Sequence, residues 1–236
     1  MIAHLVVNGC SYMEVYAVGS GHHDLCQRLG LPSCESLALG GSSNSRIIRT
    51  TAKHAATNNT HPTLYVLGMT FINRWELPVA SNNPEFEGAW RNPQSQLTEK
   101  YLGPWDLEKT RQWADLNFAG HACGAVDLLE DLMYRLVSLR YWLESRGHQL
   151  LVFRQVNDDV EELLDHARLD LFGDDMVFVN CYRWASIPWQ MEQQVPESVI
   201  MSDYPPPPQY RHRMPGHHEK LNEFLTDYIK HRNLLG

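Results

Sequence analysis

Short apolar runs recur along the chain, each bounded by glycine, proline or small polar residues. A short apolar run that ends at such a boundary is typical of a buried strand. The runs predict strands at residues 4–9, 35–39, 63–68, 149–154 and 176–180. The first run ends at a glycine, and the second is followed by a pair of glycines, so both are expected to lead directly into turns.

Between these runs, apolar residues recur at three- and four-residue steps, which is the spacing of one helix face. Helices are predicted over residues 22–29, 45–57, most of 106–145, about 158–168, and a C-terminal segment marked by Leu221, Phe224, Leu225, Tyr228 and Ile229. Strands that alternate with helices indicate a parallel sheet with helices on both faces. The predicted fold class is therefore α/β, a three-layer α/β/α sandwich with a mainly parallel sheet of about five strands, similar to flavodoxin-like folds.

One long segment interrupts this alternation. Residues 70–105 are rich in proline, asparagine, tryptophan and glycine and show no clear periodicity. Long irregular segments of compact domains often carry function. The chain has 236 residues and is 43% hydrophobic, which suffices for one sizeable core. We therefore expect a single domain over residues 1–236 with a long irregular excursion at about 70–105.

Composition narrows the range of partners and compartments. The formal net charge is −8. This charge disfavours general nucleic-acid binding and binding to anionic membranes, because both need a basic surface. The five cysteines are scattered and form no C-x-x-C pair, as expected for free thiols in a reducing compartment. No segment resembles a signal peptide or a membrane span. The expected location is the cytoplasm, and the expected partner is a small molecule.

Small polar residues follow three of the predicted strands. Ser11 follows the first strand, the segment from Gly41 to Asn44 follows the second, and Thr70 follows the third, with Asn73 and Arg74 close behind. In doubly wound folds, ligands bind beyond the carboxyl ends of the strands, so these residues are candidates for one site. Two simpler roles stay open, since a serine at such a position can cap a helix and the glycine–serine segment can be a plain turn.

The order of these segments resembles the signature blocks of the SGNH (GDSL-like) hydrolases. The resemblance spans nearly the whole chain and is closest to GDSL-like proteins predicted in bacteriophage genomes, which show similar Asn-Gly-Cys-Ser and Gly-Gly-Ser-Ser-Asn segments. It implies that Ser11 is the nucleophile and that Gly41 and Asn44 belong to the oxyanion-binding part of the site. Cys10 stands where the family has aspartate, and Thr70 stands where it has asparagine. Asn73 and Arg74 are candidates to supply the contact that Thr70 lacks.

The resemblance also implies a catalytic histidine shortly before the last helix. Counting back from the apolar face of that helix places this histidine at His212, with His217 and His218 as alternatives. The family has aspartate three residues before the histidine, whereas this chain has Gln209 there. Asp203 is the nearby acid that could orient the histidine if the four-proline run that follows it loops back.

The resemblance implies a serine esterase that acts on a small ester, with an O-acetylated sugar as one candidate substrate. A serine hydroxyl needs a neutral imidazole to take its proton, and the developing oxyanion needs preorganised N–H donors. This chemistry requires no cofactor and no metal. Paired histidines such as His22 and His23 lack a cysteine or acid at a recognisable spacing, so no metal site is predicted. Two alternatives stay open: a non-catalytic binding domain with a degenerate site, and a serine-dependent acyl transferase.

Overall fold

The computed structural model describes residues 1–40, 42–58, 61–70, 77–78, 90–91, 125–154 and 215–236. Its elements, in chain order, are β1 (His4–Gly9), α1 (Ser11–Val18), α2 (Gly21–Leu29), β2 (Ser33–Ser36), α3 (Asn44–Thr57), β3 (Thr63–Met69), β4 (Leu77–Pro78), β5 (Trp90–Arg91), α6 (Ala125–Glu144), β6 (Gln149–Arg154) and α10 (Pro215–His231). Within these residues, no helix is both long enough and apolar enough to cross a bilayer.

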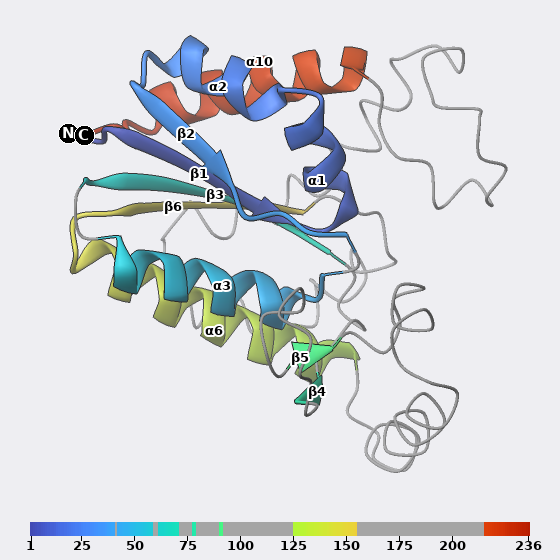
Figure 1. Ribbon diagram of the computed structural model, residues 1–236. Coiled ribbons are helices and arrows are strands. Elements are labelled where there is room, and N and C mark those ends of the chain that lie inside the picture. Colours follow the sequence, from blue (N-terminus) through green and yellow to red (C-terminus); the bar gives the residue numbers. More distant parts are fainter. Residues whose placement is uncertain (41, 59–60, 71–76, 79–89, 92–124, 155–214) are drawn as a thin grey trace, which may run out of the picture.

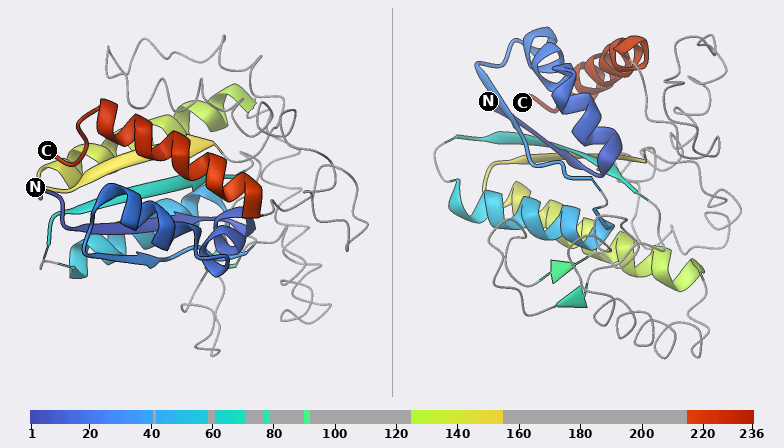
Figure 2. Two further views of the ribbon diagram at one scale, coloured as in Figure 1. Left: turned by 90° about the horizontal axis from the view of Figure 1, so that it is seen from above. Right: turned by 45° about the vertical axis from the view of Figure 1, so that its right-hand side comes forward.

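The described part of the chain forms a three-layer α/β/α sandwich, as the sequence predicts. Its main sheet has four parallel strands in the order β2-β1-β3-β6. Helices α1, α2 and α10 cover one face of this sheet, and α3 and α6 cover the other (Figure 1 and Figure 2). The predicted strand at 176–180 and the predicted helix at 158–168 lie outside the described residues.

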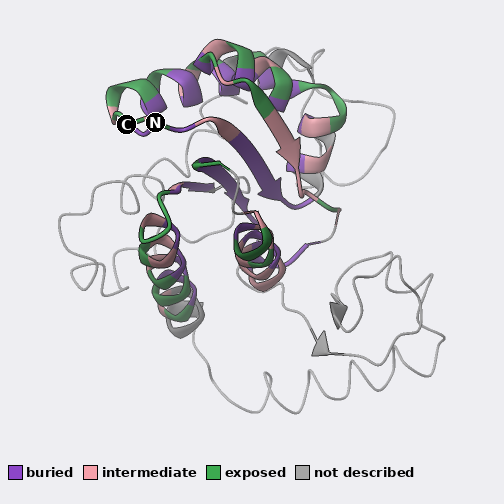
Figure 3. Cartoon of the chain, turned by 60° about the vertical axis from the view of Figure 1, so that its left-hand side comes forward, coloured by how far each residue is buried: buried purple, intermediate pink, exposed green. Residues whose placement is uncertain are grey.

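The two central strands explain why the apolar runs were informative. Every residue of β3 is buried, and so is every residue of β1 after His4. A strand that is covered by helices on both faces has no solvent-exposed face, so it appears in the sequence as an unbroken apolar run. Figure 3 shows the same pattern, with buried residues concentrated in the strands and in the inward faces of the helices.

The edge strand β2 begins two residues before its predicted range and ends three residues before the end of that range. It spans Ser33–Ser36, and its residues are only partly buried or exposed. An edge strand has one open side, so a polar sequence is tolerated there. The apolar residues that follow still bond to β1, because Leu37 N–H donates to Val7 O at 2.8 Å and Leu39 N–H to Gly9 O at 3.2 Å.

The structure confirms the helices that the apolar periodicity predicts in the described residues and adds one short helix, α1. Helices α2 and α3 each begin one residue before the predicted range and end with it. Helix α1 was not predicted as an element, because it has only eight residues and follows β1 after a single residue. The described part of the 106–145 region is α6, which begins at Ala125. At the end of the chain, Leu235 O accepts from Ile2 N–H at 3.0 Å, which fastens the C-terminal segment beside β1.

Candidate functional site at the carboxyl ends of β1 and β3

The strand order marks one place on the sheet for a ligand. From β1 the chain runs to α1 and α2 on one face, whereas from β3 it leads to α6 on the other face (Figure 1). The two strands are neighbours in register, with Gly9 opposite Gly68. In open α/β sheets, ligands bind at such a switch point, outside the carboxyl ends of the strands. The segments that follow Gly9 and Gly68 therefore form the candidate site.

Ser11 lies at the head of this site as the first residue of α1. The turn from β1 is tight, since a Cβ on Gly9 would lie 2.8 Å from Met13 Cβ and 2.9 Å from Gly68 O. Cys10 is fully buried, and its carbonyl accepts the N–H of Glu14 at 3.0 Å. The first N–H groups of a helix have no partner inside the helix and carry partial positive charge. The backbone of Ser11 therefore stands where a negative charge is stabilised.

A buried asparagine locks the end of β1 onto α3. The Asn8 side chain is 0% exposed, and its amide nitrogen lies 3.1 Å from Ile47 O and 2.9 Å from each of the hydroxyls of Thr50 and Thr51, so its two hydrogens are shared among three acceptors. Its carbonyl oxygen accepts the N–H of Gly9 at 2.8 Å. A buried polar group with every partner in place is rigid, because any movement leaves a group unsatisfied. The strand end just before Ser11 is thus held from the α3 side.

A second asparagine joins the start of α3 to the end of β3. The Asn44 amide donates to Thr70 O at 3.0 Å, and its oxygen accepts Thr70 N–H at 2.8 Å. Both residues are buried, with Asn44 5% and Thr70 2% exposed. The side chain of Asn44 therefore holds the backbone of the third predicted site segment in place. Ser43 caps α3, since its hydroxyl accepts Arg46 N–H at 3.1 Å.

The predicted histidine segment is described only from Pro215 onward. His218 lies in the first turns of α10, 7% exposed, with its ring edge-on to Tyr16 of α1 at 5.3 Å between centroids. The Tyr16 hydroxyl donates to Asn222 Oδ1 at 2.5 Å, and Asn222 Nδ2 donates to Gly21 O at 2.9 Å. Burial, followed by the charge of Asp24, raises the pKa of Tyr16 well above its usual range, so the phenol stays protonated. These contacts fasten the start of α10 to the helix that Ser11 begins.

Several predicted site residues lie outside the described part of the chain. They are Gly41, Asn73, Arg74, Asp203 and His212. For Ser11 and His217 the structure gives the backbone position but not the side chain. The structure thus brings Ser11, Asn44 and Thr70 to one edge of the sheet, and places His218 on α10 against α1.

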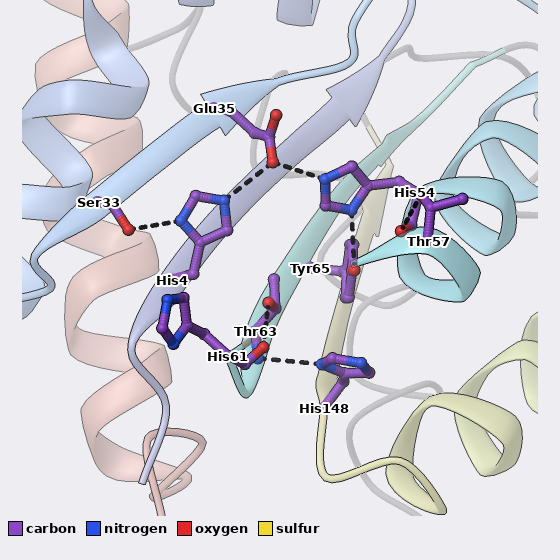
Figure 4. A network of polar contacts seen from close by, with 9 residues as sticks. All are labelled: His4, Ser33, Glu35, His54, Thr57, His61, Thr63, Tyr65 and His148. Carbon is purple, nitrogen blue, oxygen red and sulfur yellow. Dashed lines mark hydrogen bonds and ion pairs between the residues drawn. The ribbon is translucent and has the colours of Figure 1, made fainter. Parts of the chain in front are cut away.

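A second polar cluster, which sequence reasoning did not identify, lies at the other end of the sheet (Figure 4). Glu35 Oε1 accepts His4 Nε2–H at 3.0 Å and His54 Nε2–H at 2.6 Å. The remaining ring nitrogens face Ser33 Oγ at 2.7 Å and Tyr65 OH at 3.0 Å. The cluster ties together β1, β2, α3 and β3. Because its members are far apart in the sequence, no local spacing could have revealed it.

This cluster changes the acid strength of its carboxyl group. Burial acts to raise the pKa of Glu35, but the hydrogen bond from His4, together with the charge of His54 and its hydrogen bond, outweighs burial and lowers that pKa. Burial also raises the pKa of the Tyr65 hydroxyl. His4 pairs with Ser33 and Thr63 at the amino ends of the strands, whereas Ser11 follows their carboxyl ends. The cluster is therefore a structural tie at the far end of the sheet from the candidate site.

Comparison with known proteins gives distant likeness only. No protein-family model matches the chain, and no curated protein matches it. Among solved structures it is similar to a protein called TesA, at 13% identity over 96% of this chain and 98% of that one, with a TM-score of 0.47. It is also similar to the lipase/acylhydrolase from Enterococcus faecalis, at 10% identity over 98% and 97% of the two chains, with a TM-score of 0.44. Likenesses this distant assign no activity to this chain.

Proposed function

We propose that this protein is a serine hydrolase of the SGNH type that cleaves a small ester, with Ser11 as its nucleophile. The observation that carries the proposal is the position of Ser11, which begins α1 directly after β1, at the switch point between β1 and β3. At that position a serine oxygen can attack a carbonyl carbon while the same residue's backbone N–H faces the developing oxyanion. The resemblance of the four sequence blocks to SGNH hydrolases supports the same assignment, and the narrower likeness to bacteriophage proteins stays a prediction.

The proposed reaction is a two-step acyl transfer to water. Ser11 Oγ attacks the ester carbonyl as a histidine takes its proton, and the alcohol leaves with that proton. Water then attacks the acyl-serine in the same way and releases the acid. The N–H groups of Ser11 and Gly41 are the proposed oxyanion donors, each worth roughly 3 kcal/mol in the transition state.

His212 is the proposed base, and His217 and His218 are the alternatives. His218 is a buried residue of α10, and its ring packs edge-on against Tyr16. This packing supports a role for His218 in holding α10 and leaves His212, which precedes the helix, as the preferred base. Asp203 is the proposed orienting acid, because residue 209 is glutamine. Proposed substrates are short acyl esters, including the O-acetyl groups of sugars.

One structural observation favours the second candidate function, a binding domain that has lost catalysis. In the segment that follows β3, the Thr70 backbone N–H already donates to Asn44 Oδ1 at 2.8 Å. Threonine also lacks the side-chain amide that the family uses as an oxyanion donor at this position. Losing one such donor costs about 10²–10³ in rate. If Asn73 or Arg74 does not replace it, the protein would bind an ester or a related ligand with little turnover.

The test is hydrolysis of p-nitrophenyl acetate by the full-length protein between pH 5 and 9. We expect Ser11→Ala to lower kcat/KM by about 10² or more, since the nucleophile and its base act as a unit. His212→Ala should lower it similarly, whereas His218→Ala should retain most of the turnover per folded molecule. Ser138→Ala is the matched control, because Ser138 is exposed on α6. Equal rates for wild type and Ser11→Ala on several short esters would leave the binding domain as the better assignment.

An acyl transferase would keep the same residues and differ in the acceptor. Adding an alcohol or sugar acceptor to the same assay separates the two reactions, because a transferase would form a new ester faster than it releases free acid.

A further inference from the structure

Two adjacent histidines of α2 lie beside a cysteine of β2. One ring nitrogen each of His22 and His23 and the Sγ atom of Cys34 all lie within 4.8 Å of one another. The Cys34 Sγ to His23 Nδ1 distance is 3.1 Å, and the two imidazole rings lie with their centroids 4.0 Å apart and their planes tilted by 41°. Cys34 pairs with Leu5 near the amino end of β1, so this cluster is separate from the proposed site around Ser11.

The ring of His22 is the second observation that points to a ligand. His22 is 8% exposed, and its Nδ1 atom is buried with no hydrogen-bond partner among the described residues. The ring also hydrogen-bonds to the backbone of Ala17. Since Nδ1 has no partner, Nε2 makes that bond and carries the hydrogen. Nδ1 then holds a lone pair in a buried position, which is costly unless something binds it.

The contacts of His22 suit metal binding. A metal-binding histidine typically donates its other N–H to a carbonyl or carboxylate, which fixes the tautomer and orients the ring. The bond from His22 to the backbone of Ala17 supplies this second interaction.

We propose that His22, His23 and Cys34 bind a zinc ion. Two imidazoles and a thiolate form a donor set that Zn²⁺ prefers, and tetrahedral coordination leaves a fourth position for water or another ligand. Zn–S and Zn–N bonds of about 2.3 and 2.0 Å place the sulfur and nitrogen about 3.5 Å apart at a tetrahedral angle. The 3.1 Å between Cys34 and His23 must therefore widen slightly as the ion enters, and the exposed His23 ring can rotate to allow it.

Zinc binding must also displace a proton. A cysteine thiol ordinarily has a pKa of about 8.5, so without the ion this sulfur carries a proton at neutral pH. The ion replaces that proton, which passes to solvent, and the thiolate then binds the metal. Cys26 itself donates to Leu31 O at 3.2 Å and lies next to the three ligands without belonging to the group.

The test titrates the metal-free full-length protein with Co²⁺, which replaces zinc and gives a near-ultraviolet charge-transfer absorption when a thiolate binds it. We expect one Co²⁺ per chain, displacement by Zn²⁺, and loss of the charge-transfer signal in Cys34→Ser. His23→Ala, at an exposed position, should weaken affinity by more than the ~10- to 100-fold that loss of an outer-shell partner costs. His22→Ala should do the same, and His23→Ala alone suffices if His22→Ala does not fold.

Matched controls separate this site from other thiols and from the proposed esterase. Cys26→Ser and His61→Ala should retain the signal, since neither residue belongs to the ligand group and His61 is an exposed residue. Ser11→Ala should bind Co²⁺ like wild type, so a failed esterase assay would leave this result unaffected. The proposal is wrong if wild type shows no thiolate charge-transfer band, or if Cys34→Ser shows the same band as wild type.

Discussion

Replacing Asn44 with alanine tests whether the α3–β3 clamp holds the candidate site together. The substitution removes two hydrogen bonds to the Thr70 backbone, at 2.8 and 3.0 Å, between residues that are 5% and 2% exposed. Each buried group that loses its partner costs ~1–3 kcal/mol. Local movement and water recover part of this, so we expect a loss of about 2–4 kcal/mol in the free energy of unfolding.

The loss can be measured by thermal and urea unfolding. For a chain of this length, 1 kcal/mol corresponds to a shift in Tm of roughly 2–4 °C, so Asn44→Ala should lower Tm by about 5–12 °C. Lys53→Ala is the control, because Lys53 is exposed on the same helix and its loss should change stability by less than about 0.5 kcal/mol. In the folded variant, the released Thr70 segment should lower esterase kcat/KM by about 10- to 100-fold, since small misplacements at a site cost that much.

Two results would refute this reasoning. A Tm for Asn44→Ala within the range of Lys53→Ala would mean that the clamp contributes no net stability. If Asn44→Ala loses the predicted stability but the folded fraction keeps the kcat/KM of wild type, the position of Thr70 does not matter to the site.

Two further substitutions, together with Gly30→Ala as a control, test the tight turn and the far cluster. Gly9→Ala should lower the free energy of unfolding by about 1–3 kcal/mol, because its Cβ would meet Met13 and Gly68 O, and it should also lower esterase activity by shifting α1. Gly30→Ala, with φ of 67° but open space, should cost stability without lowering activity per folded molecule. For Glu35, whose pKa is lowered by folding, the added stability is present above its ordinary pKa of 4.5 and is lost as pH falls through the lower folded value. Urea unfolding between pH 5 and 3 should therefore show wild type approaching Glu35→Gln, and a constant difference would contradict this.

The sequence was most informative where burial is complete. Strands β1, β3 and β6 were predicted within a residue because their apolar runs are unbroken. The prediction for the edge strand β2 began two residues too late and ended three residues too late, since its partly exposed positions are filled by serine and glutamate and the apolar residues come after it. Helix α1 is short and begins beside a strand end, so no apolar period had room to appear.

The site was predictable in outline but not in its contacts. The position of Ser11 after β1 follows from a local pattern, whereas the clamp joins Asn44 to a residue 26 positions away. Likewise, the zinc cluster joins His23 to Cys34 across 11 residues, which matches no common ligand spacing. The sequence predicted no metal site, because no cysteine or acid stands at a recognisable spacing from the paired histidines, and it is the approach of β2 to α2 that brings a third ligand atom near both.

The most direct test of the central proposal is covalent labelling of the native full-length protein by a fluorophosphonate, followed by peptide mapping with mass spectrometry. This reagent forms a stable bond only with a serine whose oxygen is activated by a base and whose oxyanion is stabilised. We predict one adduct per chain, on the peptide that contains Ser11. The adduct should be absent in Ser11→Ala and unchanged in Ser138→Ala. Absence of any adduct in wild type, or equal labelling of Ser11→Ala, would contradict the assignment of Ser11 as the nucleophile.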